Sequence, residues 1–338
     1  MHPSSPRLVV VLTAALTLGL TACSVEESGS ASPTAGTPDD TTDDTAEVSA
    51  ADSAGATSGG TAEAGFPVTV DSDSGEVTIQ ARPERIVSLS PSATEILFAI
   101  GAGDQVIAAD QFSTYPAEAP TTDLSGFDPN VEAIVGYDPD LVIIANDSND
   151  LVASLEALDI PVMANSAPAD IEGGYDAVAA LGMATGQIDG AARVVEQMRT
   201  EMEEAFAAAP EDQEIRVYHE LDDTFFSASS NSFIGSVYEQ MGAVNIADEA
   251  DADGTGYPQL TEEAIVEADP ELIVITDQVT YTAEDVANRP GWSEISAVKN
   301  GNIVVVDADI ASRWGPRLPQ LVETVAEAMN SVSVPAGR

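Results

Sequence analysis

One short phrase of this sequence is written twice, and the repeat limits the folds that are open to the chain. Residues 132–144 read EAIVGYDPDLVII, and residues 263–275 read EAIVEADPELIVI, at a constant offset of 131 positions. Each copy is a helical turn that stops at Asp-Pro and is followed by a short apolar, β-branched run, which is typical of a buried parallel strand. The repeat therefore predicts two similar α/β lobes, and two-lobed chains commonly hold a ligand in the cleft between them.

The N-terminal residues have the pattern of a targeting segment. Arg7 precedes a small and apolar run, Leu8 to Leu20, which is too short to span a bilayer as a mature helix. The run ends at Leu20-Thr21-Ala22-Cys23, which resembles a bacterial lipobox, and Cys23 is the only cysteine in the chain. The resemblance implies a signal peptide over residues 1–22 and a lipid anchor on Cys23 at the extracytoplasmic face of the cell membrane. The alternative is a chance cysteine behind an ordinary signal peptide.

The segment that follows is expected to be an acidic, disordered tether over residues 23–65. After Cys23 it contains no aromatic residue, no Leu or Ile and no Lys or Arg, so it cannot bury enough apolar surface to order itself. The whole chain has 58 Asp plus Glu against 11 Lys plus Arg, a formal net charge of −47. Such a field excludes nucleic acid and anionic lipid surfaces as partners. The acidity indicates either cation binding or adaptation to a salty medium.

The first part of the folded region alternates strand and helix patterns. Residues 66–80 alternate apolar and polar positions around Asp73-Ser74-Gly75 and predict a β-hairpin. Ser92 and Glu95 have the spacing of a capping box and predict the start of a helix. We expect parallel strands and helices in turn, with strands at 85–89, 106–108, 141–145 and 161–164, and further helices at 131–135, 151–158 and 170–183.

The second part repeats this outline after a long helix. Residues 187–209 keep helical spacing of apolar side chains without proline, and predict a helix of roughly 30 Å. We expect strands at 215–219, 225–227, 272–276 and 303–306, and helices behind Ser232, at 261–267 and at 318–329. The prediction is an α/β fold in which Rossmann-like lobes, residues 66–186 and 210–338, are joined by the helix 187–209 and enclose a ligand cleft.

Several short motifs, in order, resemble one protein family. They are RIVSLSPSATE at 85–95, Tyr115-Pro116, DPDL at 138–141, GAVNIA at 242–247 and Gly315-Pro316-Arg317. The chain resembles the substrate-binding lipoproteins of ABC importers for vitamin B12, ferric siderophores and haem, and is most similar to the cobalamin-binding branch. The resemblance implies a monomeric binding protein, not an enzyme, whose partners are an ABC permease and its ATPase. It also implies that Glu132 and Glu263 each dock onto permease arginines through charge-assisted bonds.

Side chains at the carboxyl ends of parallel strands and in the turns that follow should line the cleft. The expected ligand contacts are Ser90, Ser92, Phe112, Tyr115, Phe127, Phe225, Tyr257, Arg313, Trp314 and Arg317. Aromatic rings suit large, flat-faced ligands, and Phe225 and Phe226 should point to opposite faces of a strand. The two arginines provide a local positive spot for ligand oxygens, or they form salt bridges to nearby acids.

The ligand class remains open between three metal chelates. A corrinoid such as cobalamin is the first choice, because Tyr257-Pro258 and the loop 313–317 match that branch, with a ferric siderophore and haem as alternatives. His219 would be a metal ligand only for haem; otherwise it is a hydrogen-bonded histidine at a strand end. An extracellular hydrolase is the alternative of another class, but the sequence has no Gly-x-Ser-x-Gly elbow, no Gly-rich phosphate loop and no His-rich metal motif. No cofactor is expected.

Overall fold

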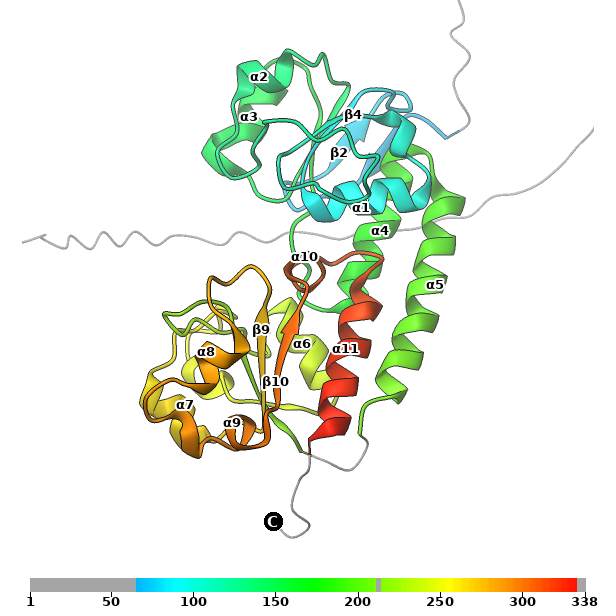
Figure 1. Cartoon of the computed structure of the whole chain (residues 1–338). Coiled ribbons are helices and arrows are strands. Elements are labelled where there is room, and N and C mark those ends of the chain that lie inside the picture. Colours follow the sequence, from blue (N-terminus) through cyan, green and yellow to red (C-terminus); the bar gives the residue numbers. More distant parts are fainter. Residues whose placement is uncertain (1–64, 211–213, 333–338) are drawn as a thin grey trace, which may run out of the picture. The chain divides into compact units, whose positions relative to one another are not determined.

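A computed structural model describes residues 65–210 and 214–332, which form two lobes around two parallel sheets (Figure 1). The strands of the N-terminal sheet lie in the order β4-β3-β5-β6, and those of the C-terminal sheet in the equivalent order β8-β7-β9-β10. The bounds are β3 Ile86–Leu89, β4 Val106–Ala109, β5 Leu141–Ile144, β6 Val162–Ala164, β7 Arg216–Glu220, β8 Val244–Asn245, β9 Leu272–Thr276 and β10 Ile303–Val306. The repeated phrase supplies β5 and β9, the same position in each sheet, so the predicted pair of Rossmann-like lobes is confirmed.

Helices cover both faces of each sheet. Those of the N-terminal half are α1 Pro91–Ile100, α2 Val131–Val135, α3 Leu151–Glu156, α4 Ile171–Thr185 and α5 Ile188–Ala207. Those of the C-terminal half are α6 Phe233–Gln240, α7 Glu262–Ala268, α8 Ala283–Ala287, α9 Ser296–Asn300, α10 Ala308–Ala311 and α11 Leu318–Ser331. The sequence did not predict α8, α9 and α10, because helices of four or five residues show too little of a helical period.

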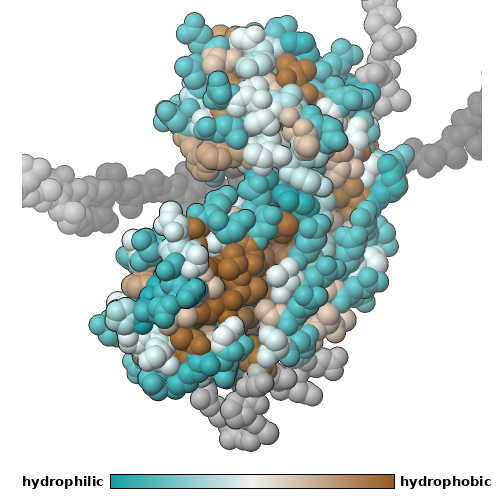
Figure 2. Space-filling view, viewed as in Figure 1, coloured by the Kyte–Doolittle hydropathy of each residue, from teal (hydrophilic) through white to brown (hydrophobic). Residues whose placement is uncertain are grey.

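The predicted N-terminal hairpin pairs β1 Val68–Val70 with β2 Val77–Ile79 in antiparallel register. Its turn covers the outer strand of the N-terminal sheet, since the Ser72 hydroxyl accepts from the Ala164 amide at 2.8 Å. The equivalent strand of the C-terminal sheet, β10, remains an edge, with Val305 47% exposed. Figure 2 shows a hydrophobic patch on this side of the C-terminal lobe.

The helix α5 lies alongside both lobes, as Figure 1 shows for its course past α4 and α11. Its buried stripe recurs every three or four residues and packs against α1, α4 and α11; it comprises Ala191, Val194, Met198, Met202 and Ala205. Gly190 at its start lies directly on α1, where a Cβ would stand 1.9 Å from the carbonyl oxygen of Ile100.

A single hydrophobic core extends through the helical side of both lobes. It includes Ile96 and Leu97 of α1, Met198 of α5, and Val322 and Val325 of α11, all 2% exposed or less. Two smaller clusters fill the opposite faces of the two sheets, one in each lobe. The lobes are therefore joined by shared apolar packing as well as by the covalent link.

Two local predictions were wrong. The N-cap of α1 is Ser90, whose hydroxyl accepts from the Ala93 amide at 3.3 Å, so Ser92 and Glu95 do not form a capping box. Residues 225–227 are not a strand, because Phe225 has a positive φ of 68° and only isolated bridges flank it.

Within the described ranges, no helix combines the length and apolar character that membrane crossing requires.

Candidate ligand-binding site

The carboxyl ends of the two parallel sheets meet where the lobes contact each other. The segment after β10 reaches the N-terminal lobe at three places: Arg313 bonds Glu95, Trp314 Nε1 donates to Asn165 Oδ1 at 3.3 Å, and Asp309 accepts from Thr114. Glu95, Thr114 and Asn165 themselves follow β3, β4 and β6. Since ligands of parallel α/β sheets bind outside the carboxyl ends of strands, this junction is the candidate site.

A cavity of about 160 Å³ opens at this junction on the side of the C-terminal lobe. His219 and Leu221 reach it from the end of β7, Thr276 from the end of β9, and Tyr257 and Trp314 from loops. Three residues predicted from the sequence, His219, Tyr257 and Trp314, therefore come together here.

A larger hollow of about 660 Å³ lies beside the N-terminal hairpin and α4. None of the predicted contact residues lines it; its polar wall includes Asp71, Asp73, Asp170 and Asp176. We place the ligand site at the smaller cavity, because the strand ends and the aromatic side chains converge there.

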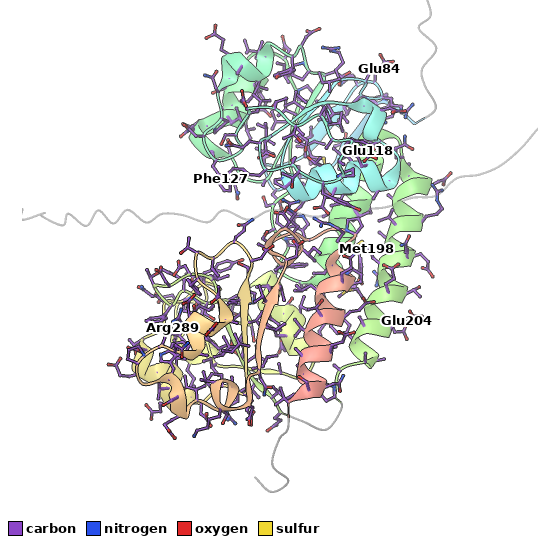
Figure 3. All side chains as sticks on the ribbon, in the orientation of Figure 1. Glu84, Glu118, Phe127, Met198, Glu204 and Arg289 are labelled. Carbon is purple, nitrogen blue, oxygen red and sulfur yellow. The ribbon has the colours of Figure 1, made fainter. Side chains whose placement is uncertain are left out.

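Three predicted aromatic residues of the N-terminal lobe expose their rings. Phe112 and Tyr115 are each 46% exposed and Phe127 is 75% exposed. Phe112 and Phe127 pack edge to face with ring centroids 5.6 Å apart, which fixes their mutual orientation. Figure 3 shows Phe127 on the side of its lobe that faces the C-terminal lobe. These three exposed rings of the N-terminal lobe are called the aromatic surface below. In the C-terminal lobe, Tyr257 is 49% exposed and lines the small cavity.

Phe225 does not belong to this surface. Its ring packs 6.0 Å from that of Trp292, and the Arg289 guanidinium lies 5.5 Å from its centroid. The neighbouring Phe226 is the exposed ring of the pair, at 38%. We therefore replace Phe225 by Phe226 as the candidate contact. The strand alternation from which Phe225 was chosen fails because the backbone turns at its positive φ.

The two predicted serines are buried in the structure. Ser90 is 0% exposed and its hydroxyl caps α1, while Ser92 is 3% exposed. A buried polar group needs a hydrogen-bond partner, and for Ser90 that partner is the helix. Capping of α1 thus explains why Ser90 stands at the end of the strand.

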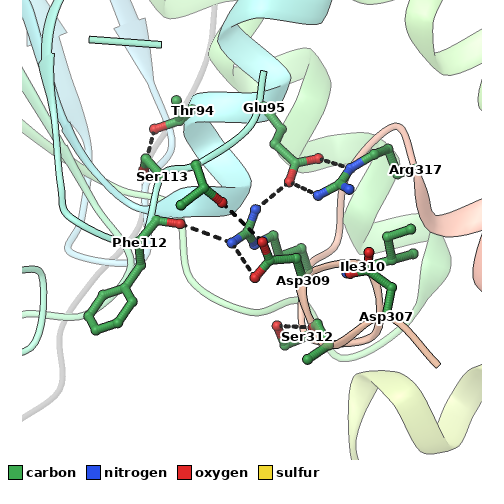
Figure 4. A network of polar contacts seen from close by, with 12 residues as sticks. Thr94, Glu95, Phe112, Ser113, Asp307, Asp309, Ile310, Ser312 and Arg317 are labelled. Atoms are coloured by element: carbon green, nitrogen blue, oxygen red, sulfur yellow. Dashed lines mark hydrogen bonds and ion pairs between the residues drawn. The ribbon is translucent and has the colours of Figure 1, made fainter. Parts of the chain in front are cut away.

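The two predicted arginines are engaged by the protein itself (Figure 4). The Glu95 carboxylate receives Arg313 Nη1 at 2.7 Å and Arg317 Nε at 2.9 Å. Arg313 also bonds Asp309 at 2.8 Å and the Phe112 carbonyl at 2.9 Å. Of the two alternatives left by the sequence, the salt bridge is the one found. No pattern along the chain points to Glu95 as the partner, because it lies 218 residues from Arg313.

The same cluster touches the aromatic surface. The Arg317 guanidinium lies 4.1 Å from the ring centroid of Tyr115, a cation–π contact. Hydrogen bonding to Glu95 and burial act in opposite directions on Arg317, and the bonding to Glu95 prevails, which raises the pKa of Arg317 above its usual value. The cluster therefore remains charged but internally neutralised.

His219 is a buried, neutral histidine. It is 2% exposed and its Nδ1 lies 2.6 Å from the Tyr238 hydroxyl. Burial lowers the pKa of the imidazole to about 4, so the ring carries no charge at neutral pH. It lines the cavity as an uncharged side chain tied to α6.

The two predicted docking glutamates occupy equivalent positions. Glu132 and Glu263 are the second residues of α2 and α7, which are capped by Asn130 and Thr261, and both are exposed. On α7 the preceding Glu262 accepts from Trp292 Nε1 at 2.9 Å, whereas no hydrogen bond or ion pair is recorded within the described residues for the Glu263 carboxylate.

A second pair of residues, two arginines that are also 131 positions apart, holds α2 and α7 in place. Arg85 donates to the Asp138 carbonyl behind α2 at 2.7 Å, and Arg216 donates to the Asp269 carbonyl behind α7 at 2.9 Å. Asp140 and Glu271 accept from the amides of these two arginines. This pair was missed although the offset of 131 between Arg85 and Arg216 is readable in the sequence.

One predicted functional residue, Cys23, lies outside the described residues together with the signal segment and most of the tether. Within residues 65–210 and 214–332, no group of three or more His, Cys, Asp or Glu side chains could hold a metal ion.

Comparisons with known proteins agree with the fold. A family model described as periplasmic binding protein matches residues 86–310. The chain is 35% identical over 275 residues to an uncharacterized ABC transporter substrate-binding lipoprotein of Bacillus subtilis, covering 78% of this chain and 86% of that protein. It is 35% identical over 282 residues to a cobalamin-binding protein of Halobacterium salinarum, covering 80% and 76%.

A solved structure of the periplasmic vitamin B12 binding protein of Vibrio cholerae has the same fold. The TM-score is 0.61 at 25% sequence identity, and the alignment covers 73% of this chain and 96% of that one.

Proposed function

Because the chain belongs to the periplasmic binding protein family, we propose that it is the substrate-binding protein of an ABC importer and that its ligand is a corrinoid such as cobalamin. The importer class is supported by the lipoprotein relative, which is similar over 78% of this chain. The corrinoid is supported by the cobalamin-binding relative, similar over 80% of it.

The observation that carries the proposal is the set of aromatic side chains near the carboxyl ends of the two sheets. Phe112, Tyr115 and Phe127 present rings from one lobe, and Tyr257 and Trp314 line the cavity of the other. A corrinoid is large and flat-faced, and stacking with apolar contact binds such a molecule without covalent chemistry. A ligand of that size would fill the cavity and extend from it between the exposed rings.

The charges at the site support a corrinoid over haem. Arg313 and Arg317 are neutralised by Glu95 and Asp309, so no free cation of this cluster attracts ligand carboxylates. Corrinoid side chains are mainly amides, whereas haem carries two propionates. His219, the haem ligand considered from the sequence, is buried against Tyr238. A ferric siderophore is the second candidate.

We further propose the arrangement of the whole protein. Residues 1–22 are a signal peptide, residues 23–65 an acidic tether lipidated at Cys23, residues 66–186 and 210–338 the two lobes, and residues 187–209 the linking segment. Glu132 and Glu263, exposed at equivalent helix positions, dock onto arginines of the permease, which works with its ATPase. The protein acts as a monomer on the extracytoplasmic face of the cell membrane and performs no catalysis.

The experiment is a binding measurement on the purified apo-protein. Cyanocobalamin, a ferric siderophore and haem are titrated separately in a calorimeter, and thermal unfolding is followed with each, since a ligand of the native state raises the melting temperature. Saturable binding of cyanocobalamin alone is the expected result. Binding of haem alone would overturn the corrinoid proposal, and binding of none of the three would overturn the metal-chelate class.

A further inference from the structure

The loop that carries Tyr257 is held by one buried aspartate. Asp251 is 7% exposed and lies six residues before Tyr257 in the sequence. Its carboxylate accepts from the backbone amides of Thr255 at 2.9 Å and Gly256 at 3.0 Å. It therefore holds the two residues that immediately precede the ring.

The same carboxylate also bonds a second segment. It accepts from the Ser229 hydroxyl at 2.5 Å and from the Asn231 side-chain amide at 2.8 Å. These residues form the turn between the end of β7 and the N-cap of α6. Asp251 thus joins the Tyr257 loop to the turn before α6, and Phe233 and Ile234 of that helix line the cavity.

The backbone around Tyr257 is fixed on both sides as a result. The Gly256 carbonyl accepts from the Ser229 amide at 2.9 Å, and the Pro258 carbonyl accepts from the Ser227 amide at 3.0 Å. Gly256 has a φ of +82°, and a Cβ there would lie 3.2 Å from the Asn231 backbone, so the two segments touch without room for a side chain. Tyr257 is nonetheless 49% exposed: its backbone is clamped while its ring is presented to the cavity.

The N-terminal lobe uses the same device. Asp110 follows β4 and is 1% exposed, and its carboxylate accepts from the Ser113 hydroxyl at 2.6 Å. The Asp110 carbonyl also accepts from the Ser113 amide at 3.1 Å, so both bonds hold the turn that contains Phe112. In each lobe, then, a buried aspartate forms hydrogen bonds with a loop that carries an exposed aromatic ring.

We propose that Asp251 is a positioning residue for ligand binding, which fixes the backbone of Tyr257 so that its ring meets the corrinoid in a set orientation. The inference rests on the proposed function. The physical reason is preorganisation: a loop already held in its bound conformation loses less conformational freedom when the ligand arrives. The several hydrogen bonds also keep the carboxylate ionised, and they lower the pKa of Asp251 to about 2.

The variants are chosen to separate positioning from charge. Asp251→Asn keeps the shape of the side chain but turns one acceptor into a donor that faces other donors. Asp248→Asn is the matched control: Asp248 lies in the same loop and accepts from the Ser230 amide at 2.7 Å and hydroxyl at 2.9 Å, but has no bond to Thr255 or Gly256. Both changes remove one negative charge from the same loop.

The binding measurement uses a double-mutant cycle with Tyr257→Ala. We expect Asp251→Asn to weaken cyanocobalamin binding about tenfold, the effect of losing hydrogen bonds to a charged group, and Asp248→Asn to leave it within about twofold. In the Tyr257→Ala background, Asp251→Asn should have no further effect, because its action passes through the ring. Full additivity of the two losses, or unchanged affinity in folded Asp251→Asn, would overturn the proposal.

A second measurement needs no ligand. Hydrogen exchange of the backbone amides of residues 254–257 should be about tenfold faster in Asp251→Asn than in the wild type, and unchanged in Asp248→Asn. Equal exchange in all three proteins would overturn the positioning role even if the affinities differed. Should the wild type bind no corrinoid, the proposed function fails and this measurement still decides the role of Asp251. If Asp251→Asn does not fold, Ser229→Ala removes one donor to the carboxylate and should give a smaller change in the same direction.

Discussion

At the scale of single residues, the charged side chains of the candidate site form salt bridges with one another, whereas several of its aromatic rings are exposed. Glu95 is 3% exposed and binds two arginines of the other lobe. A buried carboxylate with two guanidinium partners is well compensated, but each arginine depends on it. Removing one member leaves buried charge without a partner, which costs more than the intact cluster contributes.

We therefore expect Glu95→Ala to lower the free energy of unfolding by about 3–5 kcal/mol. Glu172→Ala is the control, because Glu172 forms a similar two-bonded pair with Arg199 at 2.7 and 2.6 Å but both side chains are largely exposed. That change should have little effect, since water screens an exposed pair. Urea denaturation of both variants makes the comparison, and equal losses would contradict the importance assigned to burial.

At the scale of elements, close backbone contacts and arginine hydrogen bonds hold several helices in place. The start of α5 lies against the end of α1 at Gly190, which sets the angle at which the long helix leaves the N-terminal lobe. The short helices α2 and α7 are held from behind by Arg85 and Arg216. Each of these helices presents its glutamate from a position that the adjoining sheet determines.

A matched pair of glycine substitutions tests the close contact of α5 with α1. In an open helix, Gly→Ala stabilises by about 1 kcal/mol, and Gly174 in α4 has this room, since its Cβ would lie 3.7 Å from Phe233. Gly190→Ala should instead destabilise by about 1–3 kcal/mol, because the Cβ meets backbone that cannot move aside. We expect the two substitutions to change the stability measured by thermal or chemical unfolding in opposite directions. Stabilisation by both would refute the contact.

At the scale of the whole molecule, the two lobes repeat one strand order and share one core. The repeat places Glu132 and Glu263 at equivalent positions on the two lobes, while the proposed ligand contacts come from segments outside it. On the proposed function, one set of residues meets the permease and another binds the ligand. The shared core and the Glu95 cluster also argue for small movements between the lobes.

Charge-reversing substitutions distinguish the proposed docking residues from the proposed ligand contacts. Glu132→Arg combined with Glu263→Arg should abolish uptake, because like charges would face the permease arginines, and should leave the affinity for ligand unchanged. Glu156→Arg combined with Glu267→Arg is the control, with the same change of charge on exposed helix positions. Uptake assays in cells and calorimetry on the purified proteins give the two readouts. Normal uptake by the first double variant would refute the docking role.

Much of the fold was predictable because its signals are local. The apolar, β-branched runs became β5 and β9, and the helical spacing of residues 187–209 became α5 over Ile188–Ala207. These features depend on the period of side chains along a few turns or one strand. Tyr257 and Trp314 were chosen because they match the cobalamin-binding branch, and both line the small cavity.

The tertiary structure decided which partners those side chains have. Arg313 pairs with Glu95 across 218 residues, so it forms a salt bridge where the sequence also allowed a ligand contact. Phe225 packs against Trp292 while Phe226 is exposed, and folding brings Ser229 and Gly256 to the carboxylate of Asp251. The sequence by itself determined two lobes of one kind and a long helix between them, since periodicity and repetition are written along the chain. The composition of the site was decided only in three dimensions, because hydrogen bonds and ion pairs depend on distances that a linear pattern does not contain.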